Sequence, residues 1–301
     1  MRSADAPLLK DNDARRSLTE LGVKRLEKFS GLYARAMIKR DVETVHDLRV
    51  ASRRLQQILM TFASQGAGPA KKARAFLREI RRSLGALRNL DVMAKMADER
   101  SENAASDAAR SAWTELKREI DNKRRAEDRQ AERSLMSCDL GDFLARAKKC
   151  MDEGASRNEG ALDISAALTS RLKDWREALS AAENNQSPES LHALRIAGKR
   201  LRYVLELEAA VFEPAAEKLA RSLAELQDKF GAWHDSHVLL QFAAGFLRRQ
   251  EFLAEHPGRS RALLLEMERE RRRAESEVSA GLAAAKELDG AWPQGELRQE
   301  P

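Results

Sequence analysis

The sequence predicts an all-α protein, and three observations support that prediction. Apolar residues recur at the i, i+3, i+4, i+7 spacing of an amphipathic helix almost throughout, whereas the alternating pattern of a β-strand is absent. Ala, Leu, Arg, Glu and Lys, which favour helices, dominate the composition. Glycine and aromatic residues are scarce, with 15 Gly and 5% Phe, Trp and Tyr in 301 residues, which argues against a β-sandwich or β-barrel.

Helix breakers and capping residues divide the chain into roughly eight or nine expected helices. In chain order, the breaks are expected at residues 39–41, 65–69, 138–142, 153–160, 183–188, 213–214 and 256–258. Asp41 and Ser187 have the side chains of helix N-caps, and Pro188 suits the first position of a helix.

An internal repeat organises the chain. The segment HDLRVASRRLQQIL begins at His46, and HALRIAGKRLRYVL begins 146 residues later at His192. The same offset pairs Asp41 with Ser187 and Gly85 with Gly231, a register that chance does not readily produce. We therefore expect two copies of one helical unit that pack with approximate two-fold symmetry. The copies cover about residues 12–150 and 159–290, and residues 1–11 and 291–301 are expected to be flexible termini.

Composition also limits the compartment. The two cysteines, Cys138 and Cys150, fit core positions better than a disulfide framework, which favours a reducing environment. The N-terminus has no apolar signal segment, and the longest apolar run, Val238 to Leu247, contains Gln241 and is too short for a membrane span. We expect a cytoplasmic protein without a membrane partner.

The repeated motif carries one cationic face opposite an apolar face. At 100° per residue, like charges such as Arg49 and Arg53 lie at i, i+4, where they repel by a few tenths of a kcal/mol. Ordinary solvated faces alternate charges, so an anionic ligand is the better explanation of this one. The cationic faces consist of His46, Arg49 and Arg53 in the first copy and His192, Arg195, Lys199 and Arg202 in the second.

A second basic stripe follows in the first copy alone. Between His46 and Gly85 there are nine Lys and Arg against two acidic residues, a local balance of +7 that exceeds the net charge of +6 for the whole chain. The aligned positions of the second copy lack the stripe, so we expect the two halves to contribute unequally to anion binding. The stripe consists of Lys71, Arg74, Arg78, Arg81 and Arg82.

Each copy has a second signature, LGALRNLDV from Leu84 and FGAWHDSHV from Phe230. In the second copy, His234, Asp235 and His237 could ligate a metal, although Arg88, which aligns with His234, cannot. The alternative is that the glycines of this signature, Gly85 and Gly231, permit close helix packing while the polar residues hydrogen-bond across the bundle.

These motifs resemble the CHAD family, the conserved histidine α-helical domain. HDLRVASRRL and HALRIAGKRLRYVLEL, each followed by an LG-type motif, reproduce the twofold layout of that family over most of the chain, residues 12–290. The resemblance implies two pseudo-symmetric antiparallel helical bundles around a basic cleft that binds inorganic polyphosphate, and association with polyphosphate granules. It adds Arg54 and Arg200 to the candidate ligands, while Gln56 departs from the family pattern.

We therefore expect a non-enzymatic polyphosphate-binding protein with no cofactor and no metal. Only about ten residues precede the repeat, so no triphosphatase domain of the CYTH type is expected there. The alternatives are binding of nucleic acid or another polyanion, and a His-based phosphotransfer or metal-dependent phosphate enzyme. The basic rows lack interleaved aromatic residues for base stacking, and no P-loop or convincing acidic cluster occurs. The candidate binding residues are His46, Arg49, Arg53, Arg54, Lys71, Arg74, Arg78, Arg81, Arg82, His192, Arg195, Lys199, Arg200 and Arg202.

Overall fold

A computed structural model describes residues 11–63, 68–156, 164–211 and 216–292, and it confirms the all-α prediction: these residues contain helices and no strand. The helices are α1 (Asp11–Ile38), α2 (Val42–Phe62), α3 (Gly68–Ser83), α4 (Gly85–Glu102), α5 (Asp107–Met136), α6 (Leu140–Ala155), α7 (Ile164–Asn184), α8 (Pro188–Val211), α9 (Ala216–Leu247), α10 (Gln250–Glu255) and α11 (Pro257–Gly290). The expected number of eight or nine was therefore too low.

The two motif helices start as predicted. The Asp41 carboxylate accepts a hydrogen bond from the Thr44 amide at 2.8 Å before α2. The Ser187 hydroxyl oxygen accepts one from the Ser190 amide at 3.2 Å, and Pro188 is the first residue of α8. Each N-cap satisfies a backbone donor that the first helical turn leaves without a partner.

Three helix breaks were missed, at Leu84, at residues 103–106 and at residues 248–249. None of them contains Gly or Pro, which explains why composition did not reveal them. The second break ends in Ser106, whose hydroxyl oxygen caps α5 by accepting from the Ala109 amide at 3.2 Å. The repeats also differ here, because the chain turns at Leu84 between α3 and α4 but runs unbroken through the aligned position in α9.

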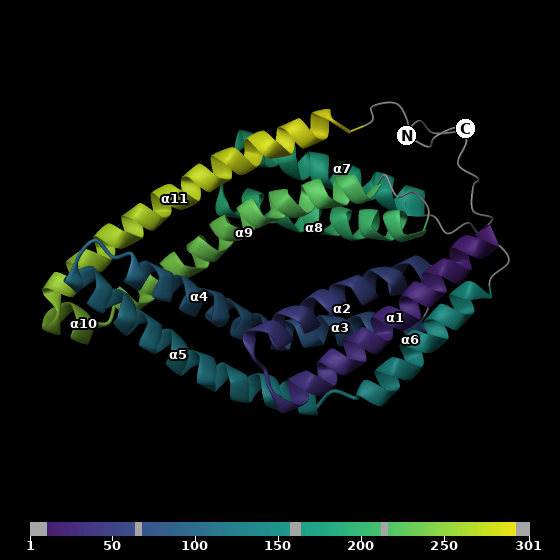
Figure 1. Ribbon diagram of the computed structural model, residues 1–301, viewed down its shortest axis with the longest axis horizontal. Helices are drawn as coiled ribbons and strands as arrows, with labels where there is room; N and C mark the ends of the chain where they lie inside the picture. Colours follow the sequence, from purple (N-terminus) through teal and green to yellow (C-terminus); the bar gives the residue numbers. More distant parts are fainter. Residues whose placement is uncertain (1–10, 64–67, 157–163, 212–215, 293–301) are drawn as a thin grey trace.

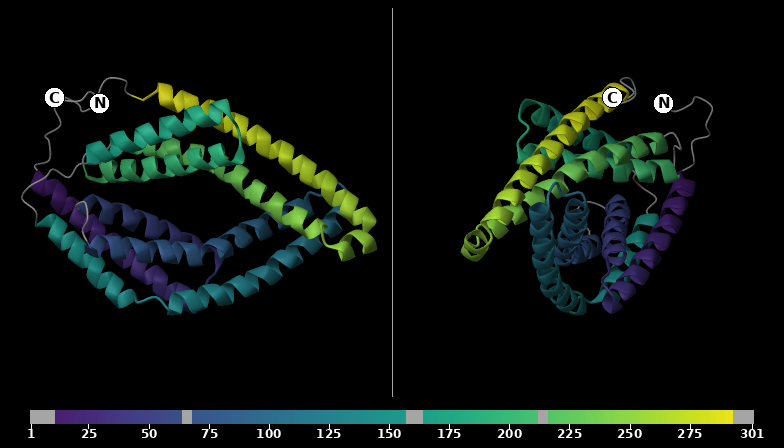
Figure 2. Two further views of the ribbon diagram at one scale, coloured as in Figure 1. Left: turned by 180° about the vertical axis from the view of Figure 1, so that it is seen from behind. Right: turned by 60° about the vertical axis from the view of Figure 1, so that its left-hand side comes forward.

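The apolar faces form three core clusters. The first combines α1, α2, α3 and α6 with the end of α5, around residues such as Leu59 and Phe143, and it also includes Val204, Leu207 and Val211 of α8. The second combines α7 and α8 with the first half of α9 and the last part of α11, around Trp175 and Phe230. The views in Figures 1 and 2 show these two groups as separate limbs that converge at the end of the molecule occupied by α10.

A third cluster lies at that end and contains helices from both repeats. It joins α4 and the first half of α5 to the last part of α9, α10 and the start of α11, with Trp113, Leu239 and Leu263 fully buried. The prediction of two helical bundles did not include this third core, to which both repeats contribute. It ties the two limbs together at this end, and the α8 residues of the first cluster join them at a second place.

A buried ion pair accompanies the shared core. The Glu270 carboxylate of α11, only 2% exposed, accepts hydrogen bonds from Arg100 Nε at 2.7 Å and Nη2 at 3.1 Å on α4. The Ser236 hydroxyl of α9 donates to the same carboxylate at 2.6 Å. A buried charge with this many partners is tolerated, and loss of one partner would leave it uncompensated.

The ends of the chain and the cysteines complete the fold. Trp292 is buried in the second cluster, so packed structure continues two residues beyond the expected boundary at 290. The flexible ends expected at residues 1–10 and 293–301 lie outside the described residues. Both cysteines belong to the first cluster, with Cys150 buried in it and Cys138 packed against it. Among the described helices, none is long and apolar enough to cross a bilayer.

Candidate functional site

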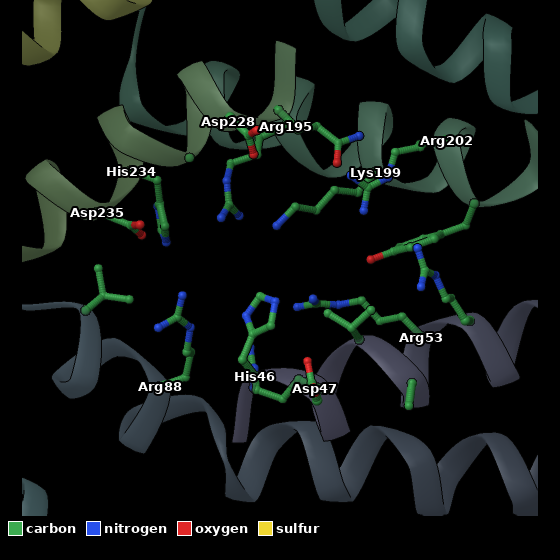
Figure 3. Close-up of a pocket in the computed structure, with 18 of the residues that line it drawn as sticks. His46, Asp47, Arg53, Arg88, Arg195, Lys199, Arg202, Asp228, His234 and Asp235 are labelled. Carbon is green, nitrogen blue, oxygen red and sulfur yellow. The ribbon is translucent and has the colours of Figure 1, made fainter. Parts of the chain in front are cut away.

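A cavity of about 770 Å³ opens between the two repeats. Helices α1, α2 and α4 form one wall, and α8 and α9 form the other. Figure 3 shows charged side chains from both walls pointing toward one another across the space, with His46, Arg53 and Arg88 on one side and Arg195 and Lys199 on the other. At the cavity the two limbs are separated by a polar space, and beside it Val204, Leu207 and Val211 of α8 pack into the first core cluster.

The lining is strongly cationic. It contains nine Lys and Arg against three Asp, a formal balance of +6, together with two histidines. The cations come from four different helices, so no single stretch of sequence builds the cavity. They are Arg25, Lys28, Arg49, Arg53, Arg54, Arg88, Arg195, Lys199 and Arg202.

On the first wall, hydrogen bonds orient the arginines of α2. Arg49 Nη1 donates to the backbone oxygen of Arg81 at the end of α3. Arg54 donates from Nε at 2.9 Å and from Nη2 at 3.3 Å to the Glu206 carboxylate of α8, a contact that joins the two repeats directly. Glu206 also lies 3.4 Å from Arg202 Nε. One carboxylate thus serves two of the cavity arginines.

On the second wall, Arg195 and Lys199 lie one turn apart on α8. Arg195 Nε is buried and, among the described residues, finds no hydrogen-bond acceptor. Burial, followed by the charges of Arg195, Arg53 and Arg202, lowers the pKa of Lys199 to about 7, and Asp235 opposes this only in part. The site therefore resists taking up another positive charge, because burial and neighbouring cations both disfavour the protonated amine.

The pKa values of the cavity histidines are lowered by the same burial and positive charge. Burial, followed by the charge of Arg88, lowers the pKa of His46. The pKa of His234 falls to about 4, through burial and then Arg195. A bound anion would oppose both effects, because it favours the charged imidazolium. On this wall burial outweighs the effect of neighbouring charges. Burial raises the pKa of the Asp235 carboxyl even though the neighbouring arginines lower it.

Half of the residues predicted from sequence line the cavity and half do not. The structure brings together His46, Arg49, Arg53, Arg54, Arg195, Lys199 and Arg202. It places the other candidates outside the lining, namely Lys71, Arg74, Arg78, Arg81, Arg82, His192 and Arg200.

The basic stripe of α3 faces away because its opposite face is core. Ala73, Leu77 and Ile80 are fully buried, so the cationic residues of the same helix point outward. Arg81 is the exception, since it turns toward α2 and donates to the Ser52 backbone oxygen at 3.4 Å. His192 is exposed beside the cavity, with its ring centroid 5.5 Å from that of His234.

Several lining residues were missed. Arg88 and His234 occupy equivalent positions of the LG-type signature at the 146-residue offset, so the repeat itself carried the signal that could have identified them. Arg25 and Lys28 precede the repeated motif on α1, and only the packing of α1 against α2 brings them to the cavity. Tyr203 of α8 also lines it.

The expectation that the glycines of the LG-type signature permit close helix packing is wrong. A Cβ atom at Gly231 would meet no atom within 4 Å, and one at Gly85 would have Arg49 Nη1 as its nearest neighbour at 3.6 Å. Gly231 instead lies on the open cavity wall.

The metal alternative also finds no support in the part of the chain that the structure describes, where no group of three or more His, Cys, Asp or Glu could hold an ion.

Fold and cavity together define an all-helical protein that holds a cationic cavity between two sequence repeats. A sequence model of the CHAD domain matches residues 24–244, and the chain belongs to the CHAD domain family. No curated protein matches the sequence.

Two solved structures share the fold. One is the crystal structure of the CHAD domain from the plant Ricinus communis, with a TM-score of 0.69 and 22% identity over 93% of this chain and 95% of that one. The other is PptA from Streptomyces chartreusis, with a TM-score of 0.68 and 18% identity over 92% of this chain and 99% of that one.

Proposed function

We propose that this protein binds inorganic polyphosphate in the cavity between its repeats and does so without catalysis. The observation that carries the proposal is the convergence of nine Lys and Arg from both limbs against only three Asp. Guanidinium groups grip phosphate oxygens in pairs, and Lys adds a compact charge. A flexible chain of phosphates supplies the repeated anionic groups that such a lining needs.

Approximate two-fold symmetry of the limbs is part of this proposal. Residues related by the 146-residue offset face the same space from opposite walls: Arg49 pairs with Arg195, and Arg53 with Lys199. Two equivalent cationic rows around one cleft would contact a phosphate chain from both sides. The unequal surroundings of the rows, such as the Arg54 contact with Glu206, would make the two contributions different in strength.

The absence of catalysis is proposed from the chemistry of the lining. Enzymes that transfer phosphoryl groups usually position a metal ion with carboxylates. Here the aspartates of the cavity, Asp47, Asp228 and Asp235, are outnumbered three to one by Lys and Arg. Such a lining suits retention of a polyanion, and we propose association with polyphosphate granules in the cytoplasm on the same ground.

Nucleic acid is the second candidate, because the same cations would meet its phosphates. Binding of single strands generally also uses aromatic platforms on which bases stack. Apart from histidines, Tyr203 is the one aromatic side chain among the lining residues. The lining therefore favours an anion without bases.

A calorimetric titration with polyphosphates of graded length, at two salt concentrations, tests the proposal. We expect affinity to rise with chain length until the cavity is filled, and to fall as salt increases. Duplex DNA added at an equal concentration of phosphate should leave the bound polyphosphate in place. Displacement by DNA would contradict the assignment, and release of phosphate that a chelator stops would contradict the absence of catalysis.

A further inference from the structure

Lys199 differs from the other lysine of the cavity in its surroundings. Its amine points into the cavity among guanidinium groups, with Arg53 opposite and Arg195 and Arg202 on its own helix (Figure 3). Within the described residues, no carboxylate lies at ion-pair distance from it. Lys28, by contrast, is exposed on α1. The Lys199 amine is therefore held beside phosphate-binding groups without a counter-charge of its own.

These surroundings leave much of the amine unprotonated at neutral pH. The groups that face it are Arg53 on α2, Arg195 and Arg202 on α8, and His234 and Asp235 on α9, and the arginines outweigh the one carboxylate. Burial and these charges lower the pKa of Lys199 to about 7. Lysine nucleophiles arise in this way, by desolvation and neighbouring cations.

We propose that Lys199 is an acylation site for small acyl phosphates such as acetyl phosphate. The guanidinium groups would hold the phosphate, and the Nζ lone pair would attack the acyl carbon beside it. The bond between the acyl carbon and the bridging oxygen breaks, and its electron pair leaves with the phosphate. The nitrogen then releases a proton to water, so the products are Nε-acyl-lysine and inorganic phosphate.

This inference rests on the proposed function in one respect, namely that the cavity arginines bind phosphate. It goes beyond that function because acylation of Lys199 would regulate polyphosphate binding. An acylated lysine can no longer become charged, so the modified cavity loses one cation at its centre. We therefore expect polyphosphate to bind the acylated protein several-fold more weakly than the unmodified protein.

The experiment compares two acyl donors on the full chain at pH 7.5, with mass spectrometry of individual lysines. Acetyl phosphate carries the docking group, and the N-hydroxysuccinimide ester of acetic acid does not. The internal reference is Lys173 on α7, whose side chain is 78% exposed. An ordinary lysine is only about 0.1% neutral at this pH. We expect acetyl phosphate to modify Lys199 at least about tenfold faster than Lys173, and the ester to show a several-fold smaller preference.

Three outcomes would overturn the inference: equal rates at the two lysines with acetyl phosphate, the same preference with both donors, or no protection of Lys199 by inorganic pyrophosphate. Arg53→Gln should remove the extra preference for acetyl phosphate, whereas Arg118→Gln, at a position 74% exposed on α5, should not. Circular dichroism checks that both variants fold. Polyphosphate titration of the unmodified chain separates the two proposals, because either reaction or binding can fail without the other.

Discussion

The cavity rows and the α3 stripe are two basic regions with the same sequence pattern and different surroundings. Both repeat Lys and Arg at helical spacing with few acidic residues between them. Arg53, Arg195 and Lys199 face the opposite limb across an enclosed space, whereas Lys71 and Arg78 on α3 are exposed to solvent. Charges that share a partly desolvated space reinforce one another, while exposed charges are screened by water and salt.

The comparison teaches that charge density along the sequence is a poor guide to charge density in space. The α3 stripe contributes most of the local excess of +7 between His46 and Gly85. Yet Arg81 is engaged with α2, Arg82 forms an ion pair with Glu79, and the stripe residues lie outside the cavity. We therefore expect the cavity, and not the stripe, to dominate polyphosphate affinity.

The largest expected effect tests that expectation directly. Arg53→Gln, Arg195→Gln and Lys199→Gln combined should weaken polyphosphate binding about a thousandfold or more, since three charge-assisted contacts of roughly 1.5–3 kcal/mol each are lost. The matched control removes the same charge from α3, with Arg74→Gln, Arg78→Gln and Arg82→Gln. It should cost about fivefold at most, because exposed charges are screened.

Titration calorimetry measures both triple variants, and circular dichroism should show unchanged helicity because the buried apolar faces remain intact. If removal of the three α3 charges weakens polyphosphate binding as much as removal of the three cavity charges, the cavity does not dominate affinity.

Arg88 tests whether the LG-type signature belongs to the cavity. Arg88→Gln should weaken polyphosphate binding about tenfold, the loss of one charge-assisted contact of roughly 1.5 kcal/mol. Lys95→Gln on the same helix is the control, because the Lys95 side chain is 79% exposed and outside the cavity lining. Equal affinities of the two variants in the same calorimetric assay would exclude Arg88 from the binding surface.

Affinity should depend on pH in a direction that Lys199 determines. Its pKa in the free protein is about 7, and a bound phosphate raises it, so binding takes up a proton above that pH. Polyphosphate binding should therefore weaken between pH 6.5 and 8, by at most about eightfold if the bound lysine returns to an ordinary pKa.

Lys199→Arg should flatten this dependence, because arginine stays charged throughout. His46 and His192 act in the same direction near pH 6, since their pKa values are lowered in the free protein. Calorimetry in buffers of different ionisation enthalpy measures the proton uptake directly. An affinity that is constant across this range, or that rises with pH, would argue against an uncompensated cationic cavity.

The smallest expected effect is a gain in polyphosphate affinity. Glu206 accepts two hydrogen bonds from Arg54 and lies close to Arg202, so Glu206→Gln should release positive charge toward the cavity. Polyphosphate affinity at low salt should rise roughly two- to threefold, the size of a partly exposed ion pair. Glu79→Gln, which frees Arg82 on α3, should leave affinity unchanged if the stripe does not contribute.

Much of the fold was readable from local features of the sequence. The caps at Asp41 and Ser187 and the helical periodicity identified α2 and α8 at the same relative positions in both repeats. Such signals depend only on neighbouring residues, which makes them accessible without a structure. The break at Leu84 was not accessible, because Leu84 has no capping side chain and the adjacent Gly85 aligns with Gly231, which lies inside the unbroken α9.

The sequence by itself determined the helices, the repeat and the presence of cationic faces, because helical periodicity and like charges at i, i+4 are local properties. Only the tertiary structure decided which cationic faces share a space. The shared core around Trp113 and the buried Glu270–Arg100 pair join the limbs at one end, and α3 turns its apolar side to the first core. These contacts place Arg25, Arg88 and His234 in the cavity and leave the α3 stripe outside, since packing of distant helices depends on all of their apolar faces at once.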